Sequence, residues 1–139
     1  MRLPSDTALL VIEGPAGADP GAKAMIAGLV AAWREERLPV FALRPGDAFA
    51  ETELELDTVG ATTLVICGAL AKGSVEATLR AFAALGYRVF LVEDACSPAS
   101  DMRALAGDDA KVVDGATTLA AARRARARER WKAARRGGG

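Results

Sequence analysis

Apolar residues in this chain fall into short continuous runs, separated by longer stretches in which they recur every three or four positions. Four of the runs have the length of strands: Thr7 to Ile12, Leu38 to Leu43, Thr62 to Cys67 and Arg88 to Val92. A fifth, shorter strand is expected at Ala110 to Val113. Continuous runs of this kind are typical of parallel strands that are covered on both faces.

The stretches between the strands predict helices. Asp19 is a good N-cap and Pro20 suits the first helical position. Apolar residues then recur with helical spacing and would form one face of the helix: Met25, Ile26, Leu29, Val30 and Trp33. The segment from Ser74 to Leu85 repeats this spacing at Val75, Leu79, Phe82 and Leu85. We also expect a short acidic helix at Glu51 to Val59 and a helix that opens after Gly115 to Thr118 and runs from Leu119 towards Arg136.

Strands that alternate with helices predict a Rossmann-like, doubly wound α/β domain. Its three layers would be α/β/α, around a mainly parallel sheet of about five strands. Parallel neighbours joined by a helix form right-handed βαβ units, so the loop from Gly68 to Gly73 should lie at the carboxyl edge of the sheet. Open sheets of this class bind their ligands at that edge.

The amino-acid composition excludes several kinds of catalytic site. The 139 residues include no histidine and two cysteines, Cys67 and Cys96, whose spacing indicates neither a disulfide framework nor a metal site. Without histidine, Ser-His-Asp and Cys-His catalysis are excluded. No apolar run has the roughly 20 residues of a membrane span, and the N-terminus does not resemble a signal sequence. We therefore expect a cytoplasmic protein that does not bind a membrane and needs no metal or other cofactor.

Charge is unevenly distributed along the chain. Residues 123–136 carry eight Arg or Lys and one Glu, a local charge of +7, whereas the rest carries ten basic and seventeen acidic residues, or −7. We divide the chain into a domain at 1–122 and a basic helical tail at 123–139. The tail has three interpretations: a solvated helix, which is the commonest case, a subunit contact through Leu119, Ala122 and Trp131, and a nucleic-acid arm. The last is the weakest, because the chain has no folded recognition motif, so nucleic acid is not an expected partner.

The central segment resembles the isochorismatase-like cysteine hydrolases. Their pattern is an apolar strand, a Gly, a nucleophile six residues later followed by Val, then a Thr, Gly-Tyr and Asp-Ala. This chain has those landmarks at Gly68, Ser74, Val75, Thr78, Gly86, Tyr87, Asp94 and Ala95. In the family a Cys, an Asp and a Lys act together on the substrate. The resemblance extends over most of residues 7 to 122.

All three catalytic positions depart from the family. Ser74 stands at the position of the nucleophilic Cys, and Glu13 follows the first strand where the family has Asp. The segment that bears the catalytic Lys looks deleted, because no lysine occurs between Lys23 and Lys72 and Arg44 is the only cation near its place. A serine hydroxyl is much harder to ionise than a thiol, and Glu13 is the only base that the resemblance supplies.

The remaining site residues come from the same resemblance. The family's oxyanion loop corresponds to Ala69, Leu70 and Gly73, with a cis peptide expected at Ala69-Leu70, and Arg44 would line the pocket. Ser74 also has a simpler interpretation as a helix N-cap, which we favour by about three to one. Lys72 could replace the missing cation and Cys96 could be a relocated nucleophile, although a surface lysine and a structural thiol are the commoner cases. Glu13, Glu93 and Asp94 could converge at one edge, without a spacing that demands Mg²⁺.

Two functions follow from this pattern. The first is a catalytically degenerate member of the family that acts as a binding or assembly subunit, in a homo-oligomer or a hetero-oligomer. The alternative is a working hydrolase of a small amide or vinyl ether that uses Ser74 and Glu13, with a small-molecule ligand at the oxyanion loop. Turnover that depends on Ser74 would distinguish the two.

Overall fold

The computed structural model describes residues 3–4, 6–12, 20–43, 56–69, 79–97, 107 and 110–125, with the backbone alone for Leu43, Ala69, Cys96 and Ser97. The strands are β1 (Ala8–Ile12), β2 (Val40–Leu43), β3 (Thr63–Ala69), β4 (Arg88–Ser97) and β5 (Lys111–Val113). The long helix is α1 (Pro20–Glu35), and residues 56–59, 79–84 and 115–125 are also helical. No helix among these residues is long and apolar enough to cross a membrane.

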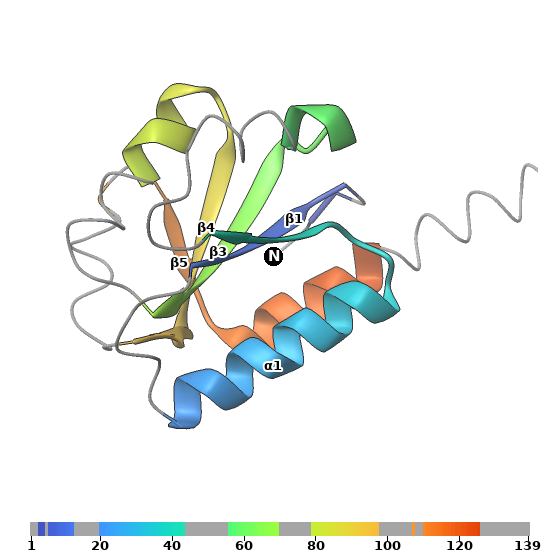
Figure 1. Ribbon diagram of the computed structural model, residues 1–139, viewed down its shortest axis with the longest axis vertical. Coiled ribbons are helices and arrows are strands. Elements are labelled where there is room, and N and C mark those ends of the chain that lie inside the picture. Colours follow the sequence, from blue (N-terminus) through green and yellow to red (C-terminus); the bar gives the residue numbers. More distant parts are fainter. Residues whose placement is uncertain are drawn as a thin grey trace, which may run out of the picture.

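All five strands are parallel and form one sheet in the order β2-β1-β3-β4-β5. Helix α1 and residues 115–125 lie side by side on one face, and the helical segments 56–59 and 79–84 lie on the other (Figure 1). The predicted doubly wound, three-layer α/β fold of about five strands is therefore confirmed.

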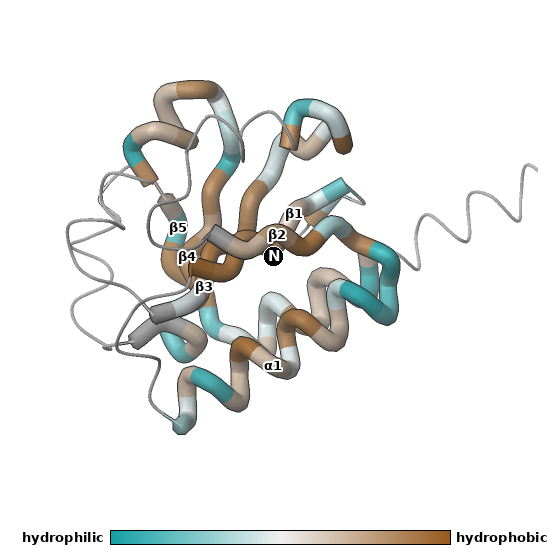
Figure 2. Tube along the Cα trace, in the orientation of Figure 1, coloured by the Kyte–Doolittle hydropathy of each residue, from teal (hydrophilic) through white to brown (hydrophobic). Residues whose placement is uncertain are grey.

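Successive side chains of each strand point to opposite faces of the sheet, so the protein has two hydrophobic cores. In β1, Leu10 faces the core that contains Leu79 and Phe82, whereas Leu9 faces the core that contains α1. The strands are accordingly the most apolar part of the trace (Figure 2). Trp33 of α1 is fully buried, and its indole N–H donates to the carbonyl oxygen of Thr7 at 3.1 Å. This bond fixes the end of α1 to the start of β1, since a buried indole needs an acceptor.

Several predicted boundaries were wrong. Strands β3 and β4 continue to Ala69 and Ser97, beyond the predicted ends at Cys67 and Val92, with an irregular register between Ile66 and Gly68. The last helix begins at Gly115 instead of Leu119, and Leu85 is 49% exposed although the helical stripe predicted it buried. Leu85 lies beyond the last helical residue of 79–84, so the spacing of the stripe no longer determines where its side chain points.

Three helices end in the same backbone turn. In each, an amide donates to a carbonyl five residues earlier: Leu38 to Trp33, Ala61 to Leu56 and Tyr87 to Phe82. The residue before each donor has a positive φ, which is easy for Gly60 and Gly86 but strained for the exposed Arg37, at φ 57°. Arginine therefore occupies a position where glycine would be more stable.

Gly68 allows β3 to approach β1 closely. It pairs with Ile12 on one side and Cys96 on the other, at φ 133°. A Cβ atom at this position would collide with the carbonyl oxygen of Ile12 and lie 2.7 Å from its nitrogen. Both atoms belong to the backbone of a buried strand, so neither can move aside without disrupting the sheet.

We predict that Gly68→Ala lowers the free energy of unfolding by roughly 3 kcal/mol or more, because the new Cβ meets the β1 backbone and the φ angle is unfavourable. Gly28→Ala is the matched control, since Gly28 lies inside α1 and the added methyl group meets no neighbouring side chain or strand within 4 Å. That control should gain about 0.5–1 kcal/mol. Urea denaturation measures both, and a Gly68→Ala protein as stable as the wild type would contradict the analysis.

Candidate functional site

Three adjacent strands end together at the carboxyl edge of the sheet. Ile12 pairs with Leu43 at the end of β2 and with Gly68 near the end of β3. The chain leaves β1 for β2 on one side and later returns to β3 on the other, so the connections diverge between β1 and β3. In open α/β sheets, such a divergence forms the crevice in which ligands bind.

The predicted site residues follow these three strand ends in the sequence. Glu13 comes directly after Ile12, and Arg44 comes directly after Leu43. Both lie outside the described residues, as do Leu70, Gly73 and Ser74 with the expected cis peptide. Ala69 is described by its backbone, which pairs with Ser97 of β4 at the same edge. The structure therefore places the strands that lead into the predicted site and leaves the contacts of its side chains untested.

The two cysteines occupy different positions relative to this edge. Cys67 is fully buried inside β3, in the core beneath α1, which confirms that it is a packing residue. A buried thiol in apolar surroundings is inert, so Cys67 cannot act as a nucleophile. The backbone of Cys96 pairs with Gly68, so Cys96 lies on the strand next to β3.

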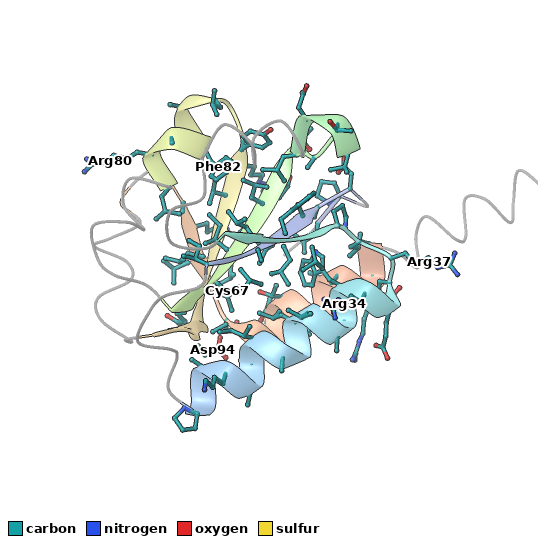
Figure 3. The ribbon with its side chains drawn as sticks, viewed as in Figure 1. Arg34, Arg37, Cys67, Arg80, Phe82 and Asp94 are labelled. Atoms are coloured by element: carbon teal, nitrogen blue, oxygen red, sulfur yellow. The ribbon has the colours of Figure 1, made fainter. Side chains whose placement is uncertain are left out.

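Asp94, which the sequence analysis placed with Glu13 and Glu93 at one edge, caps a helix. Its Oδ1 accepts a hydrogen bond of 2.7 Å from the backbone N–H of Gly115, the first residue of the helix at 115–125. Figure 3 shows Asp94 on the same side of the sheet as α1. The bond joins residues 21 apart in the chain, so no local sequence signal predicts it. It ties the carboxyl end of β4 to the layer that contains α1.

Asp114 caps the same helix from the preceding position. Its Oδ2 accepts from the backbone N–H of Thr117 at 3.0 Å, and its carbonyl accepts from the Thr118 hydroxyl at 2.7 Å. Hydrogen bonds from the side chain and then the amide of Thr117 lower the pKa of the Asp114 carboxyl below its ordinary value. An Asp directly before a helical stretch is an N-cap signal, and Asp114 could have predicted the true helix start.

Within the described part of the chain, no three cysteine or acidic side chains come together in a way that could hold a metal ion. Glu93 is exposed at this edge beside Asp94, whose carboxylate is held by the cap. The described edge thus consists of strand ends and a capped helix.

Comparison with known proteins identifies the family. A family model described as the isochorismatase domain matches residues 32–122. The chain belongs to the isochorismatase family. The match covers the end of α1, strands β2 to β5 and most of the last helix, and it contains the landmarks from Gly68 to Ala95. No protein in the curated set matched the chain.

Solved structures, among them members of the isochorismatase family, share this fold. An isochorismatase-family protein from Burkholderia thailandensis is 19% identical, over 88% of this chain and 98% of its own, with a TM-score of 0.68. An isochorismatase from Pseudomonas putida is 22% identical, over 84% and 92%, with a TM-score of 0.66. The MAR1 ribonuclease from Caenorhabditis elegans is 17% identical, over 86% and 82%, with a TM-score of 0.59.

We predict that Asp94→Ala costs about 1 kcal/mol of stability, because it removes an acceptor from a helix N-terminus. Glu93→Ala is the matched control, since it removes the same charge from the neighbouring exposed residue and should change stability by less than about 0.5 kcal/mol. Thermal or urea unfolding of both variants gives the comparison. Equal losses would mean that the charge at this edge matters and the cap does not.

The Asp114 cap makes stability depend on pH. Because its pKa is lower in the folded protein than in the unfolded chain, its contribution is complete above the ordinary value of 3.8. It is lost as the pH falls through the lower, folded pKa. Wild type should therefore be more stable than Asp114→Ala near neutral pH, and the two melting curves should converge under acid conditions. A difference that persisted unchanged in strong acid would contradict this role for the carboxylate.

Proposed function

We propose that this isochorismatase-family protein has lost the family's cysteine-dependent hydrolysis and acts as a binding or assembly subunit. The observation that carries the proposal is Ser74 at the position of the nucleophilic cysteine. Two further departures agree with it: Glu13 replaces the family's Asp, and no lysine lies between Lys23 and Lys72. One substitution could retune a reaction, whereas three remove the nucleophile, alter the reach of the base and delete the cation.

Thiolate chemistry depends on all three groups. A thiol ionises near pH 8.5, and a neighbouring cation lowers that pKa into the working range. A serine hydroxyl needs a strong general base, and histidine is absent from the chain. Glu13 is one methylene longer than the family's Asp, so a proton relay spaced for Asp would be misaligned by about 1 Å, which alone can cost about 10²-fold in rate.

The described residues support the proposal in two ways. Cys67 is buried within β3, so it cannot replace the missing nucleophile. The Asp94 carboxylate accepts a hydrogen bond from the amide of Gly115, which gives it a structural reason to stand at this edge without a catalytic role. The sheet and its close β1-β3 approach at Gly68 are nevertheless retained. A domain that keeps the sheet and loses the catalytic groups is suited to binding a ligand or a partner subunit, in a homo-oligomer or a hetero-oligomer.

The decisive experiment measures turnover and thiol ionisation together. Purified wild type and Ser74→Ala are assayed against small amides and isochorismate, and we expect no turnover that distinguishes them. Ser74→Cys is then made in a Cys96→Ser background, and its alkylation by iodoacetamide is followed against pH. Without an activating cation, the new thiol should titrate near the ordinary value of about 8.5.

Either of two results would overturn the proposal. Turnover by wild type that Ser74→Ala abolishes would establish the alternative, a hydrolase of a small amide or vinyl ether acting through Ser74 and Glu13. If the thiol that Ser74→Cys introduces titrates well below a pH of about 7, a cation still activates this position. The Cys96→Ser protein with Ser74 intact is the control, because it reports any reaction at Cys67.

A further inference from the structure

The two edges of the sheet differ in how they are protected. In the described part of the chain, β2 and β5 each pair with a single neighbour. Edge strands offer unpaired backbone groups to other chains, and proteins protect them with charged side chains or by keeping them short. Strand β5 is protected in both ways, because it has three residues and carries the exposed Lys111. Strand β2 (Val40–Leu43) contains no charged residue.

The hydrogen bonding between β1 and β2 determines which backbone groups of β2 face outward. The amide of Leu9 donates to the carbonyl oxygen of Pro39 at 2.9 Å, so this carbonyl points towards β1. Successive residues of a strand direct their N–H and C=O groups to opposite sides. The groups of Phe41 therefore also point to β1, whereas those of Val40 and Ala42 point away from the sheet. No described residue pairs with β2 on that side, and Ala42 is exposed there.

Both hydrophobic cores end at β2 in side chains that are only partly covered. Val40 packs against the core beneath α1, and Phe41 packs against the core that contains Leu79. Their neighbours in the β1 register, Leu9 and Leu10, are fully buried, whereas Val40 and Phe41 are half-buried. Another strand beside β2 would cover both side chains and extend both cores.

We propose that the outer edge of β2 is a self-association surface, to which a second copy of this chain adds its own β2 as an antiparallel strand. A two-fold axis perpendicular to the sheet relates the two strands and passes beside Phe41. Val40 then lies opposite Ala42 of the partner subunit, and the two residues exchange both of their backbone hydrogen bonds. The symmetric pair does the same. The two copies of Phe41 form the close, non-hydrogen-bonded pair between them.

Charge favours a second copy as the occupant of this edge. When a strand pairs with itself, each charged residue lies near its own copy, and like charges there are destabilising. Strand β2 has no charge, and Arg37, the nearest described charged residue, is four residues from the axis. At about 3.4 Å per residue, the two copies of Arg37 lie roughly 27 Å apart along the strands. Pro39 does not interfere, because its carbonyl faces β1.

The pairing of two strands of four residues gives a small interface. Specific interfaces of standard size bury about 1,600 Å², so this dimer should be weak, with a dissociation constant on the order of 100 µM. The inference names a partner for the proposed assembly role and rests on that proposal for its purpose. The pairing itself uses neither Glu13 nor Ser74. A dimer that hydrolyses substrate through Ser74 would therefore overturn the proposed loss of hydrolysis and support the pairing of β2.

The test follows the full chain by sedimentation equilibrium and by amide hydrogen exchange in NMR spectra. Concentrations from about 10 µM to 1 mM bracket the expected dissociation constant. We expect a monomer that converts to a dimer over this range. The amides of Val40 and Ala42 should become protected as the dimer forms, because they gain acceptors in the partner subunit. The amide of Phe41 faces β1 and should be protected at every concentration.

Substitutions at Ala42 test the symmetry of the pairing. Ala42→Lys and Ala42→Glu each place two like charges at diagonal positions about 7–8 Å apart, so each variant should dimerise at least about tenfold more weakly than wild type. An equimolar mixture of the two should recover the dimer, because opposite charges then meet. Ala120→Lys is the matched control, since Ala120 is exposed on helix 115–125. It should leave the dissociation constant unchanged within about twofold.

Several results would overturn the proposal. Two of them are a protein that stays monomeric up to about 1 mM and equal effects of Ala42→Lys and Ala120→Lys. A mixture of the Ala42→Lys and Ala42→Glu proteins that remains monomeric would also contradict the two-fold pairing. A dimer in which the Val40 and Ala42 amides exchange freely would place the contact on another surface. A monomer in which these amides are already protected would mean that the chain covers its own edge.

Discussion

The contact between β3 and β1 at Gly68 is the constraint on which the candidate site depends. A parallel sheet can form a crevice only where its connections diverge, and in this chain they diverge between these two strands. The absence of a side chain at Gly68 lets the backbones of the two strands meet there, at a φ that glycine adopts readily. The strand ends that lead to Glu13 and to the loop after Ala69 are consequently held side by side. The close approach of β1 and β3 depends on their backbones, so it does not require any particular residue after the two strand ends.

The carboxyl edge is also held together by carboxylates that act as helix caps. Asp94 and Asp114 accept from the first and third amides of the helix at 115–125, where unsatisfied N–H groups favour negative charge. In an active α/β enzyme, acidic residues at this edge are natural candidates for acid-base catalysis. Here the hydrogen bonds of Asp94 and Asp114 show that both residues stabilise the start of a helix. The distinction matters for the proposed loss of chemistry, because these two carboxylates have a structural role that needs no catalytic one.

The sequence predicted most of the fold because the relevant signals are local. Buried parallel strands appear as continuous apolar runs, and the Asp19-Pro20 pair marked the start of α1 at Pro20. Leu29 and Trp33 are buried as the helical spacing requires. The extension of β4 to Ser97 was missed because it depends on pairing with β3 across an irregular register. The Asp94 cap was missed because its partner is 21 residues away.

The candidate site was likewise predicted only in part. The resemblance to the isochorismatase family located the edge of the sheet and the strands that enter it, because those follow from topology. It could not determine what replaces a missing cation, because that depends on side chains brought together in three dimensions. Arg37 illustrates the opposite case, in which a residue works against the stability of its own backbone position. A strained residue persists when the surroundings hold it in place, and such residues concentrate at functional sites. At Arg37 the bond from the Leu38 amide to the Trp33 carbonyl holds the backbone in this conformation, so the turn that ends α1 sets the φ angle and the arginine side chain tolerates it.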